Sequence, residues 1–232
     1  MRTKVTTIGF DADDTLWQNE QFFRLTQERF AELLSDFVDP DHLAARLVAA
    51  ERRNLGRYGF GIKGFTLSMI EAAIEVSDAK VPASVIAELI DAGQEMLAHP
   101  IELLPHVEDV ITELSRDHAI LLITKGDLLD QERKLAQSGL GEMFEAVEIV
   151  SDKVPGVYTR AFAPFGGTST AMMVGNSVKS DVIPALEAGA WGIHVPHDLT
   201  WEYELADEPA AHARFRQIED LGQLPKLIRE LV

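Results

Sequence analysis

The sequence predicts an α/β protein with a doubly wound parallel sheet and an inserted α-helical cap domain. Two observations support this fold class. Short apolar, β-branched segments alternate with amphipathic helical segments over the second half of the chain, as in βαβ units. One further strand pattern lies near the N-terminus, and a long block with helical periodicity separates it from the others. Because crossovers between parallel strands are right-handed, helices are expected on both faces of the sheet.

The first strand is expected in the apolar and β-branched run from Val5 to Phe10. From Trp17 to Leu97, apolar residues instead recur at helical spacing. The segment from His99 to Pro105 contains two prolines and is expected to be the linker that returns the chain to the sheet. We therefore predict a core domain of residues 1–16 and 100–232 and a helical cap domain of residues 17–99.

After this linker, helix and strand patterns alternate. The acidic stretch Asp198–Glu208 is expected to be a solvated loop without a function. Helices are expected near Val107–Ser115, Leu128–Ser138, Val157–Ala163, Ser180–Ala188 and Leu221–Leu231, and strands near His118–Thr124, Ala146–Val150, Thr170–Val174, Trp191–Val195 and Phe215–Ile218.

Composition narrows the class of function. The formal net charge of −17 argues against nonspecific binding to nucleic acid or to an anionic membrane surface. Disulfides, thiolate nucleophiles and zinc–sulfur sites are excluded because the sequence has no cysteine. No apolar signal core and no run of about 20 apolar residues is present. We expect a soluble cytoplasmic protein.

Three carboxylates follow the first strand directly, at Asp11, Asp13 and Asp14. In an open α/β sheet, ligands bind at this carboxyl end of the strands. Carboxylates this close together repel one another unless positive charge lies among them, and Mg²⁺ is a suitable partner for oxygen ligands that also surround a phosphate. The alternative is an acidic turn or helix N-cap, where Asp is common.

Polar residues also follow the other predicted strands. Thr124 and Lys125 end the second strand, Lys153 follows the third, and Asp181 follows the fourth. Because the strands are parallel, these residues are expected at one edge of the sheet together with Asp11. Taken singly, each has an ordinary structural explanation, and Lys125 or Lys179 competes with Lys153 for the role of the cation.

In this order the motifs resemble those of the haloacid dehalogenase-like (HAD) hydrolase superfamily. The matching features are Asp-x-Asp-x-Thr at Asp11–Thr15, then Thr124, then Lys153, then Gly-Asn-x4-Asp at Gly175–Asp181. They extend over nearly the whole chain, and the position of the cap resembles the family's type-one (C1) helical cap. The resemblance implies a Rossmann-like core and phosphoryl transfer through an aspartyl-phosphate.

The resemblance also implies residue roles. Asp11 would be the nucleophile, and Asp13 would protonate the leaving group and then activate water. Thr124 would donate a hydrogen bond to the phosphoryl group, and Lys125 is a further candidate for binding it. Lys153 would neutralise negative charge on the nucleophile and on the phosphoryl group.

A Mg²⁺ cofactor is implied by the same resemblance. Its ligands would be the carboxylates of Asp11 and Asp181 and the backbone carbonyl of Asp13. Asn176 stands where the family often has aspartate, so one negative charge near the cation is missing. We expect Asn176 to contact a metal-bound water rather than the metal itself, and metal affinity to be weaker.

The cap contains an unusual basic segment, Glu51–Gly64, with four cations and one acid, a sum of +3. Its four glycines permit a close approach of the backbone. One interpretation is a substrate loop in which Arg57 or Lys63 contacts an anionic group. The other is a solvated helix end followed by a turn.

The preferred function is a Mg²⁺-dependent phosphohydrolase that acts on a small phosphorylated metabolite. A 2-haloacid dehalogenase is an alternative, but halide leaves without protonation, so Asp13 favours the phosphatase. A phosphomutase on the same core, and a non-catalytic phosphate- or metal-binding module, also stay open. No nucleic-acid or membrane partner is expected.

Overall fold

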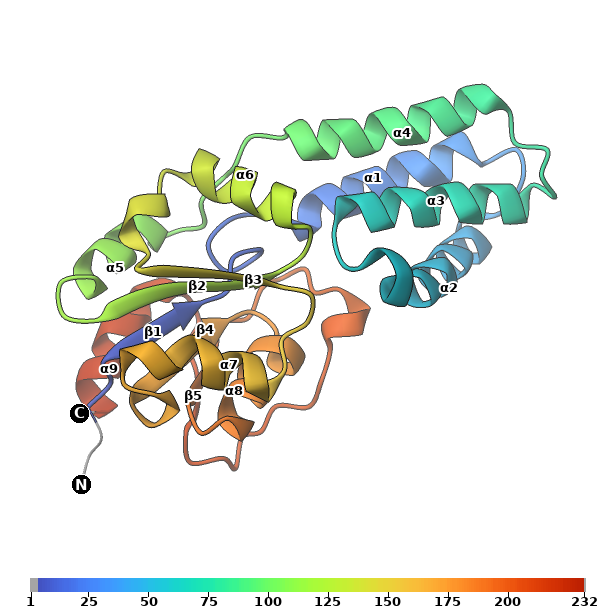
Figure 1. The fold of residues 1–232 in the computed structure, drawn as a ribbon. Coiled ribbons are helices and arrows are strands. Elements are labelled where there is room, and N and C mark those ends of the chain that lie inside the picture. The colour runs from blue at the N-terminus through green and yellow to red at the C-terminus, as the bar shows by residue number, and fades with distance from the viewer. Residues whose placement is uncertain (1–3, 232) are drawn as a thin grey trace. The chain divides into compact units, whose positions relative to one another are not determined.

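Six parallel strands form one sheet in the order β3-β2-β1-β4-β5-β6 (Figure 1). The computed structural model describes residues 4–231. The first strand lies inside the sheet, and the chain adds strands outward from it on both sides, which is the doubly wound arrangement. The strands are β1 (Thr7–Phe10), β2 (Ala119–Lys125), β3 (Ala146–Val150), β4 (Ala171–Gly175), β5 (Trp191–His194) and β6 (Phe215–Gln217).

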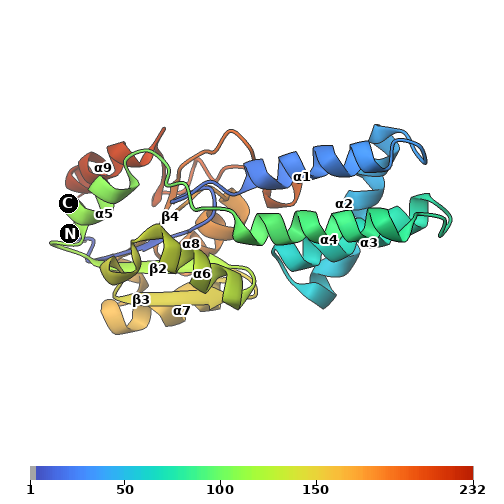
Figure 2. The same cartoon turned by 90° about the horizontal axis from the view of Figure 1, so that it is seen from above.

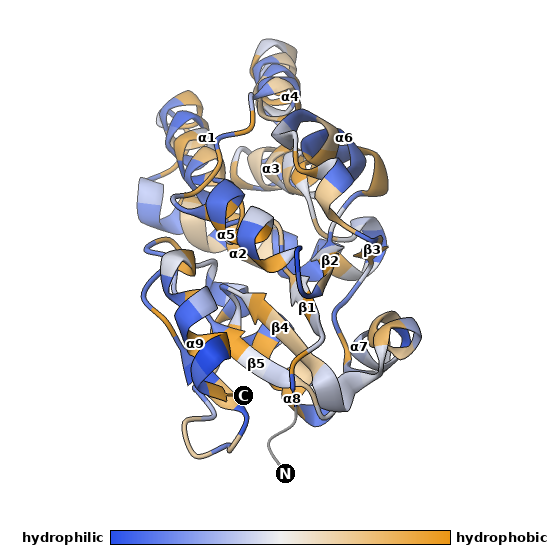
Figure 3. Cartoon of the chain, turned by 90° about the vertical axis from the view of Figure 1, so that its left-hand side faces the viewer, coloured by the Kyte–Doolittle hydropathy of each residue, from blue (hydrophilic) through white to orange (hydrophobic). Residues whose placement is uncertain are grey.

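Helices cover both faces of this sheet, because its strands are apolar on both sides. In β2, Ile120 and Leu122 pack in one cluster with α5 (Val107–Leu114) and α9 (Leu224–Leu231). Their neighbours in β2, Leu121 and Ile123, belong to a second cluster with α7 (Pro155–Phe162) and α8 (Ile183–Glu187). The buried strands are correspondingly hydrophobic in Figure 3. The predicted fold class is therefore confirmed.

A second group of helices, labelled α1 to α4 in Figure 2, has a hydrophobic core of its own. Phe30, Leu47, Met69 and Leu89 are among its buried side chains, one from each helix. Apolar residues at a spacing of three or four make one side of each helix hydrophobic, and burial of these sides holds the helices together. The helices are α1 (Glu20–Leu33), α2 (Pro40–Tyr58), α3 (Ile62–Val76) and α4 (Ala83–Ala98).

The chain thus divides into two compact units. One contains residues 4–20, Ile101–Lys125 and residues 131–231, and the other contains Gln21–Pro100 with Gly126–Asp130. The second unit therefore includes the short loop before α6 (Leu128–Ser138) and the first residues of that helix. The boundaries of the two sequence-based domains stay a prediction. None of the described helices is long and apolar enough to cross a bilayer.

The helix predicted at Ser180–Ala188 does not begin as a regular α-helix. Residues Val178–Val182 form a short π-helical turn that leads into α8. Pro184 has no backbone N–H and cannot donate to the carbonyl of Ser180, four residues earlier. The hydroxyl of Tyr158 donates to that carbonyl instead, at 2.8 Å. This contact comes from a distant helix, so local periodicity did not reveal it.

The expectation for Asp198–Glu208 was wrong in one respect. This stretch contains a short 3-10 turn at Glu202–Glu204, and the side chain of Glu204 is only 12% exposed. Burial of a carboxylate requires compensating donors, and Glu204 has them. The stretch is therefore not a simple solvated loop.

The basic segment Glu51–Gly64 is mostly helical. Helix α2 continues to Tyr58, and α3 begins at Ile62 after a short turn. A Cβ atom on Gly64 would come within 2.9 Å of the Gly59 carbonyl oxygen, so the absence of a side chain permits this tight turn. Arg53 forms ion pairs with two acidic side chains of α3. Part of the positive charge therefore holds α2 against α3.

Glu51 in α2 provides a test of this helical core. Its side chain is buried, its Oε2 atom has no hydrogen-bond partner, and burial raises its pKa to about 7. In the unfolded chain, Glu51 ionises near pH 4.5. Between pH 4.5 and 7 the folded state therefore binds more protons than the unfolded state, and the free energy of unfolding falls as pH rises over this range. Glu51→Gln should therefore stabilise the protein by up to about 3 kcal/mol at pH 8 and hardly at pH 4.5. Urea unfolding at both pH values measures this difference, and exposed Glu88→Gln is the control. Equal effects at both pH values would contradict the assignment.

Candidate active site

Three charged side chains from separate parts of the sequence meet at the carboxyl end of the sheet. Asp11 follows β1, Lys153 follows β3, and Asp181 lies in the π-helical turn after β4. Lys153 donates hydrogen bonds to the Oδ1 atom of Asp11 and, at 2.6 Å, to the Oδ1 atom of Asp181. All three side chains are buried. Parallel strands bring these positions together, as the sequence predicted.

The charges of this group do not balance, because two carboxylates share one ammonium group. Burial and the neighbouring charge of Asp181 raise the pKa of Asp11 to about 7, although Lys153 opposes the shift. Burial alone would lower the pKa of Lys153, but the two carboxylates outweigh it and raise the pKa above its ordinary value. Lys153 is therefore a permanent cation, and one further positive charge would favour the ionised form of Asp11.

Thr15 links the nucleophile candidate to Asn176. Its hydroxyl lies 3.3 Å from Asp11 Oδ2 and 3.3 Å from Asn176 Oδ1, and it accepts from the Asn176 backbone N–H at 3.0 Å. The hydroxyl has one hydrogen, so it donates to one of these two oxygens at a time. Asn176 therefore borders the site, and its side-chain oxygen lies within two contacts of Asp11.

Gly175 is required for close packing rather than for an unusual backbone angle. A Cβ atom at this position would collide with the carboxylate of Asp181. The same carboxylate accepts from the backbone N–H of Ser177 at 3.0 Å through Oδ2. The loop from Gly175 to Asp181 therefore folds back on itself, and this orients the Asp181 side chain toward Lys153.

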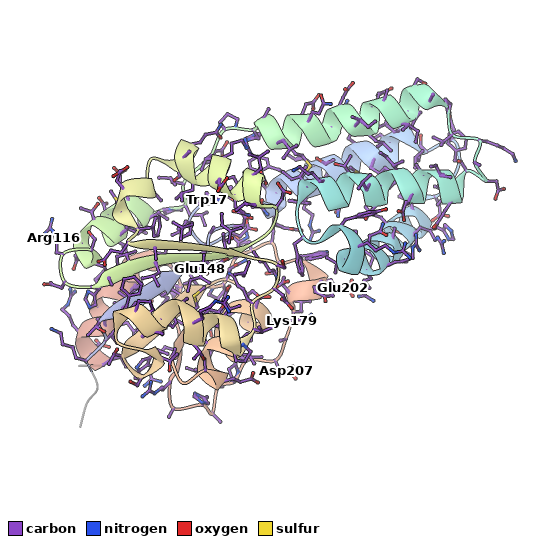
Figure 4. All side chains as sticks on the ribbon, in the orientation of Figure 1. Trp17, Arg116, Glu148, Lys179, Glu202 and Asp207 are labelled. Atoms are coloured by element: carbon purple, nitrogen blue, oxygen red, sulfur yellow. The ribbon has the colours of Figure 1, made fainter. Side chains whose placement is uncertain are left out.

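The carboxylate of Asp13 contacts a different set of side chains. Its Oδ1 atom accepts from Trp17 Nε1 at 2.7 Å and from Lys134 Nζ at 2.9 Å, and its Oδ2 atom accepts from Gln131 Nε2 at 2.8 Å. Trp17 is labelled in Figure 4. Burial alone would raise the pKa of Asp13, but Lys134 and these hydrogen bonds outweigh it and lower the pKa below its ordinary value.

Lys134 and Gln131 were missed by the sequence analysis. They stand three residues apart on α6, so their side chains lie on one side of the helix. Both are buried, with exposures of 6% and 3%. A buried lysine is unusual without a charged partner, but the helical pattern does not reveal that the partner is Asp13.

Asp14 has the structural role that the alternative interpretation proposed. Its backbone adopts a left-handed conformation, with φ of 59°. Its carboxylate accepts from the backbone N–H groups of Asn19 and Glu20, at 2.9 and 3.0 Å, where α1 begins. The three carboxylates after β1 therefore have separate partners, which are Lys153 for Asp11, Lys134 for Asp13 and these backbone groups for Asp14.

The remaining predicted residues are distributed more widely. Thr124 is buried near the carboxyl end of β2. Lys125 donates to Ser180 Oγ at 2.7 Å and to Glu204 at 2.5 Å, so its ammonium group is engaged within the core unit. Arg57 is exposed in the last turn of α2, and Lys63 in α3 forms an ion pair of 2.9 Å with Asp127, both within the second unit. Within the core unit, the structure thus brings Asp11, Lys153 and Asp181 together.

The oxygen atoms around Asp11 are suitable ligands for a Mg²⁺ ion. Within residues 4–231, no three His, Asp or Glu side chains lie close enough together to hold a metal ion by themselves. Two buried carboxylates with a deficit of positive charge are nevertheless present, and uncharged oxygens lie close by on Asn176 and Thr15. Mg²⁺ commonly takes one or two carboxylates and fills its other positions with water and phosphate oxygens. Asp11 and Asp181 would hold it, with the Asp13 carbonyl as a further ligand.

Comparison with known proteins identifies the family. A model of the haloacid dehalogenase-like hydrolases matches residues 5–189 of this chain. The chain belongs to this family. A solved HAD-family hydrolase from Xanthomonas campestris is 40% identical, with a TM-score of 0.87, over 98% of this chain and 91% of the other. No curated protein is similar enough to count as a match.

More distant solved structures share the HAD fold. YfnB from Bacillus subtilis, described as bound to magnesium, is 15% identical, with a TM-score of 0.68, over 97% of this chain and 99% of that one. The L-2-haloacid dehalogenase of Xanthobacter autotrophicus is 19% identical, with a TM-score of 0.65, over 98% of this chain and the full length of that one. At such identities the likeness shows the fold alone, and the fold carries more than one chemistry.

Proposed function

We propose that this HAD hydrolase is a Mg²⁺-dependent phosphatase for a small phosphorylated metabolite, acting through an aspartyl-phosphate on Asp11. The observation that carries the proposal is the pair Asp11 and Asp13. Asp11 is buried and Asp13 is partly buried, and each forms an ion pair with a different lysine. A phosphatase needs a second carboxylate to transfer protons, whereas loss of halide from a haloacid needs none. The arrangement supports phosphoryl transfer over dehalogenation.

In the proposed reaction, a carboxylate oxygen of Asp11 attacks phosphorus and the bond from phosphorus to the ester oxygen breaks. The leaving oxygen takes a proton from Asp13. Asp13 then accepts a proton from water, the resulting hydroxide attacks phosphorus, and the bond to Asp11 breaks to release phosphate. Lys153 offsets negative charge on the transferring group, and the hydroxyl of Thr124 is proposed to donate a hydrogen bond to it. Bound Mg²⁺ would supply further charge neutralisation.

The contacts of Asp13 indicate which oxygen exchanges the proton. Its Oδ1 atom accepts from Lys134 and Trp17, whereas its Oδ2 atom accepts from Gln131. A carboxylate oxygen has two lone pairs, so Oδ2 retains a position for a proton or for a substrate contact. The lysine lowers the pKa of Asp13 and so favours its ionised form, which is the form that accepts a proton from water in the second step. Lys134 would therefore position Asp13 and tune it.

Lys134→Met should slow the reaction most for leaving groups that need a proton. We expect kcat/KM to fall about 100-fold for an alkyl phosphate, in the usual range for acid–base assistance, and much less for p-nitrophenyl phosphate. Steady-state assays on both substrates measure the difference. Lys134→Arg keeps the charge and should recover part of the loss. Equal losses on both substrates would indicate a purely structural role.

Substrate selection is proposed to come from the helical unit, because the core residues act on the phosphoryl group that all substrates share. Arg57 and Lys63 are the candidates for contacting an anionic part of the metabolite. Lys63 would have to exchange its partner Asp127 for the substrate. Lys125 is proposed to assist phosphate binding only indirectly, since its ammonium group contacts Glu204.

A panel of phosphorylated metabolites, assayed for phosphate release with and without Mg²⁺, tests this function. Several 2-haloacids are included and assayed for halide release. We expect Mg²⁺-dependent phosphate release and no halide. Halide release without phosphate release would identify a dehalogenase instead. Binding of phosphate without turnover of any compound would indicate a binding module.

A further inference from the structure

Glu204 lies far from the motif residues in the sequence, yet it contacts the loop that carries one of them. Its carboxylate accepts from the hydroxyl groups of Ser177 and Ser180 at 2.6 and 2.5 Å, and from Lys125 at 2.5 Å. Burial alone would raise its pKa, but Lys125 and the two hydroxyls outweigh it and lower the pKa below its ordinary value. Glu204 is therefore a buried, fully engaged carboxylate.

The two serines form part of the backbone turn that presents Asp181. Ser177 Oγ accepts from the Ser180 N–H at 3.0 Å, and the Ser177 N–H donates to Asp181 Oδ2. Both hydroxyls that contact Glu204 thus belong to the turn between Gly175 and Asp181. A rotation of the Ser177 side chain would break its contact with the Ser180 N–H, which lies in the same turn as the Ser177 N–H that donates to Asp181.

The segment around Glu204 is attached to the same turn at a second point. Lys179 donates to the carbonyl of Tyr203 at 2.7 Å, and its ammonium group lies 3.6 Å from the centre of the Tyr203 ring. Figure 4 labels Lys179 and, in the turn that contains Glu204, Glu202. These contacts join residues 202–204 to residues 177–181 at two points, Glu204 and Tyr203.

We propose that Glu204 is a positioning residue: through the hydroxyl groups of Ser177 and Ser180 it fixes the turn that presents Asp181 to Asp11 and Lys153. A loop that only closed over the surface would not need a buried carboxylate with three donors. The consequence for metal binding rests on the proposed function, in which Asp181 is a Mg²⁺ ligand.

The test compares Glu204→Gln with Glu202→Gln in the full-length protein. Both changes remove one negative charge from the same short turn, but the side chain of Glu202 is exposed. Mg²⁺ affinity is measured by calorimetry, without substrate. We expect Glu204→Gln to weaken Mg²⁺ binding about 10-fold, the low end of the range for residues that orient metal ligands, and Glu202→Gln to leave it unchanged. An unchanged affinity in Glu204→Gln, or equal losses in both variants, would overturn the inference.

Amide hydrogen exchange over residues 176–182 gives a second readout that needs no metal. Exchange should be faster in Glu204→Gln than in the unaltered protein and in Glu202→Gln. If the unaltered protein binds no Mg²⁺, the metal part of the proposed function fails, and exchange alone decides the role of Glu204. Unchanged exchange would then overturn it. If Glu204→Gln does not fold, Ser180→Ala, which removes one of the two hydroxyls, takes its place in both measurements with the same expected results.

Discussion

Asp11→Asn is expected to reduce phosphate release to background in the presence of Mg²⁺. The amide has nearly the shape of the carboxylate but cannot attack phosphorus, and Asp11 is the carboxylate that contacts both Thr15 and Lys153. The fold should persist, because the amide oxygen still accepts from Lys153. Circular dichroism and thermal unfolding check the fold, and phosphate release from p-nitrophenyl phosphate measures activity.

Asp152→Asn is the matched control. Asp152 is exposed next to Lys153, and its Oδ1 atom accepts from the Lys153 backbone N–H at 2.9 Å, a contact that an amide oxygen retains. Activity close to that of the unaltered protein is expected in this variant. Substantial phosphate release by Asp11→Asn would show that Asp11 is not the nucleophile.

Lys153→Met should impair both activity and stability. The variant leaves the carboxylates of Asp11 and Asp181 buried without their shared cation, which costs about 3 kcal/mol in comparable buried pairs. Loss of charge stabilisation at the phosphoryl group should lower kcat about 100- to 1000-fold. Urea unfolding and steady-state kinetics measure the two effects.

Mg²⁺ should restore more stability to Lys153→Met than it adds to the unaltered protein, because the metal replaces the missing positive charge. Lys226→Met changes an exposed lysine on α9 and should alter neither property. If Lys153→Met were as stable as the unaltered protein without metal, the charge deficit inferred around Asp11 would be wrong.

The core fold could be predicted from the sequence because its signals are local. Strands such as β3 and helices such as α6 have apolar patterns that end at clear boundaries, and both were predicted with the observed bounds. The convergence of Asp11, Lys153 and Asp181 also followed from the sequence, since residues after parallel strands meet at one edge. The roles of these residues stay predictions.

The contacts of Asp13, Asp14 and Glu204 could not be predicted, because each depends on tertiary structure. Asp13 and Asp14 are neighbours in the sequence, yet one contacts Lys134 and the other caps α1. Glu204 lies in an acidic stretch whose composition indicates exposure, and only the fold brings Lys125 and two serines to it. Charge patterns predict which side chains need partners, but not which partners they find.

The central claim, that Asp11 carries the phosphoryl group during turnover, is tested most directly by mass spectrometry. The protein is mixed with Mg²⁺ and an aryl phosphate, quenched rapidly in acid and digested. We expect a phosphoryl adduct on the peptide that contains Asp11, absent from Asp11→Asn and from samples without Mg²⁺. Turnover without any such adduct, or an adduct on that peptide formed from 2-chloropropionate but not from the phosphate, would contradict it.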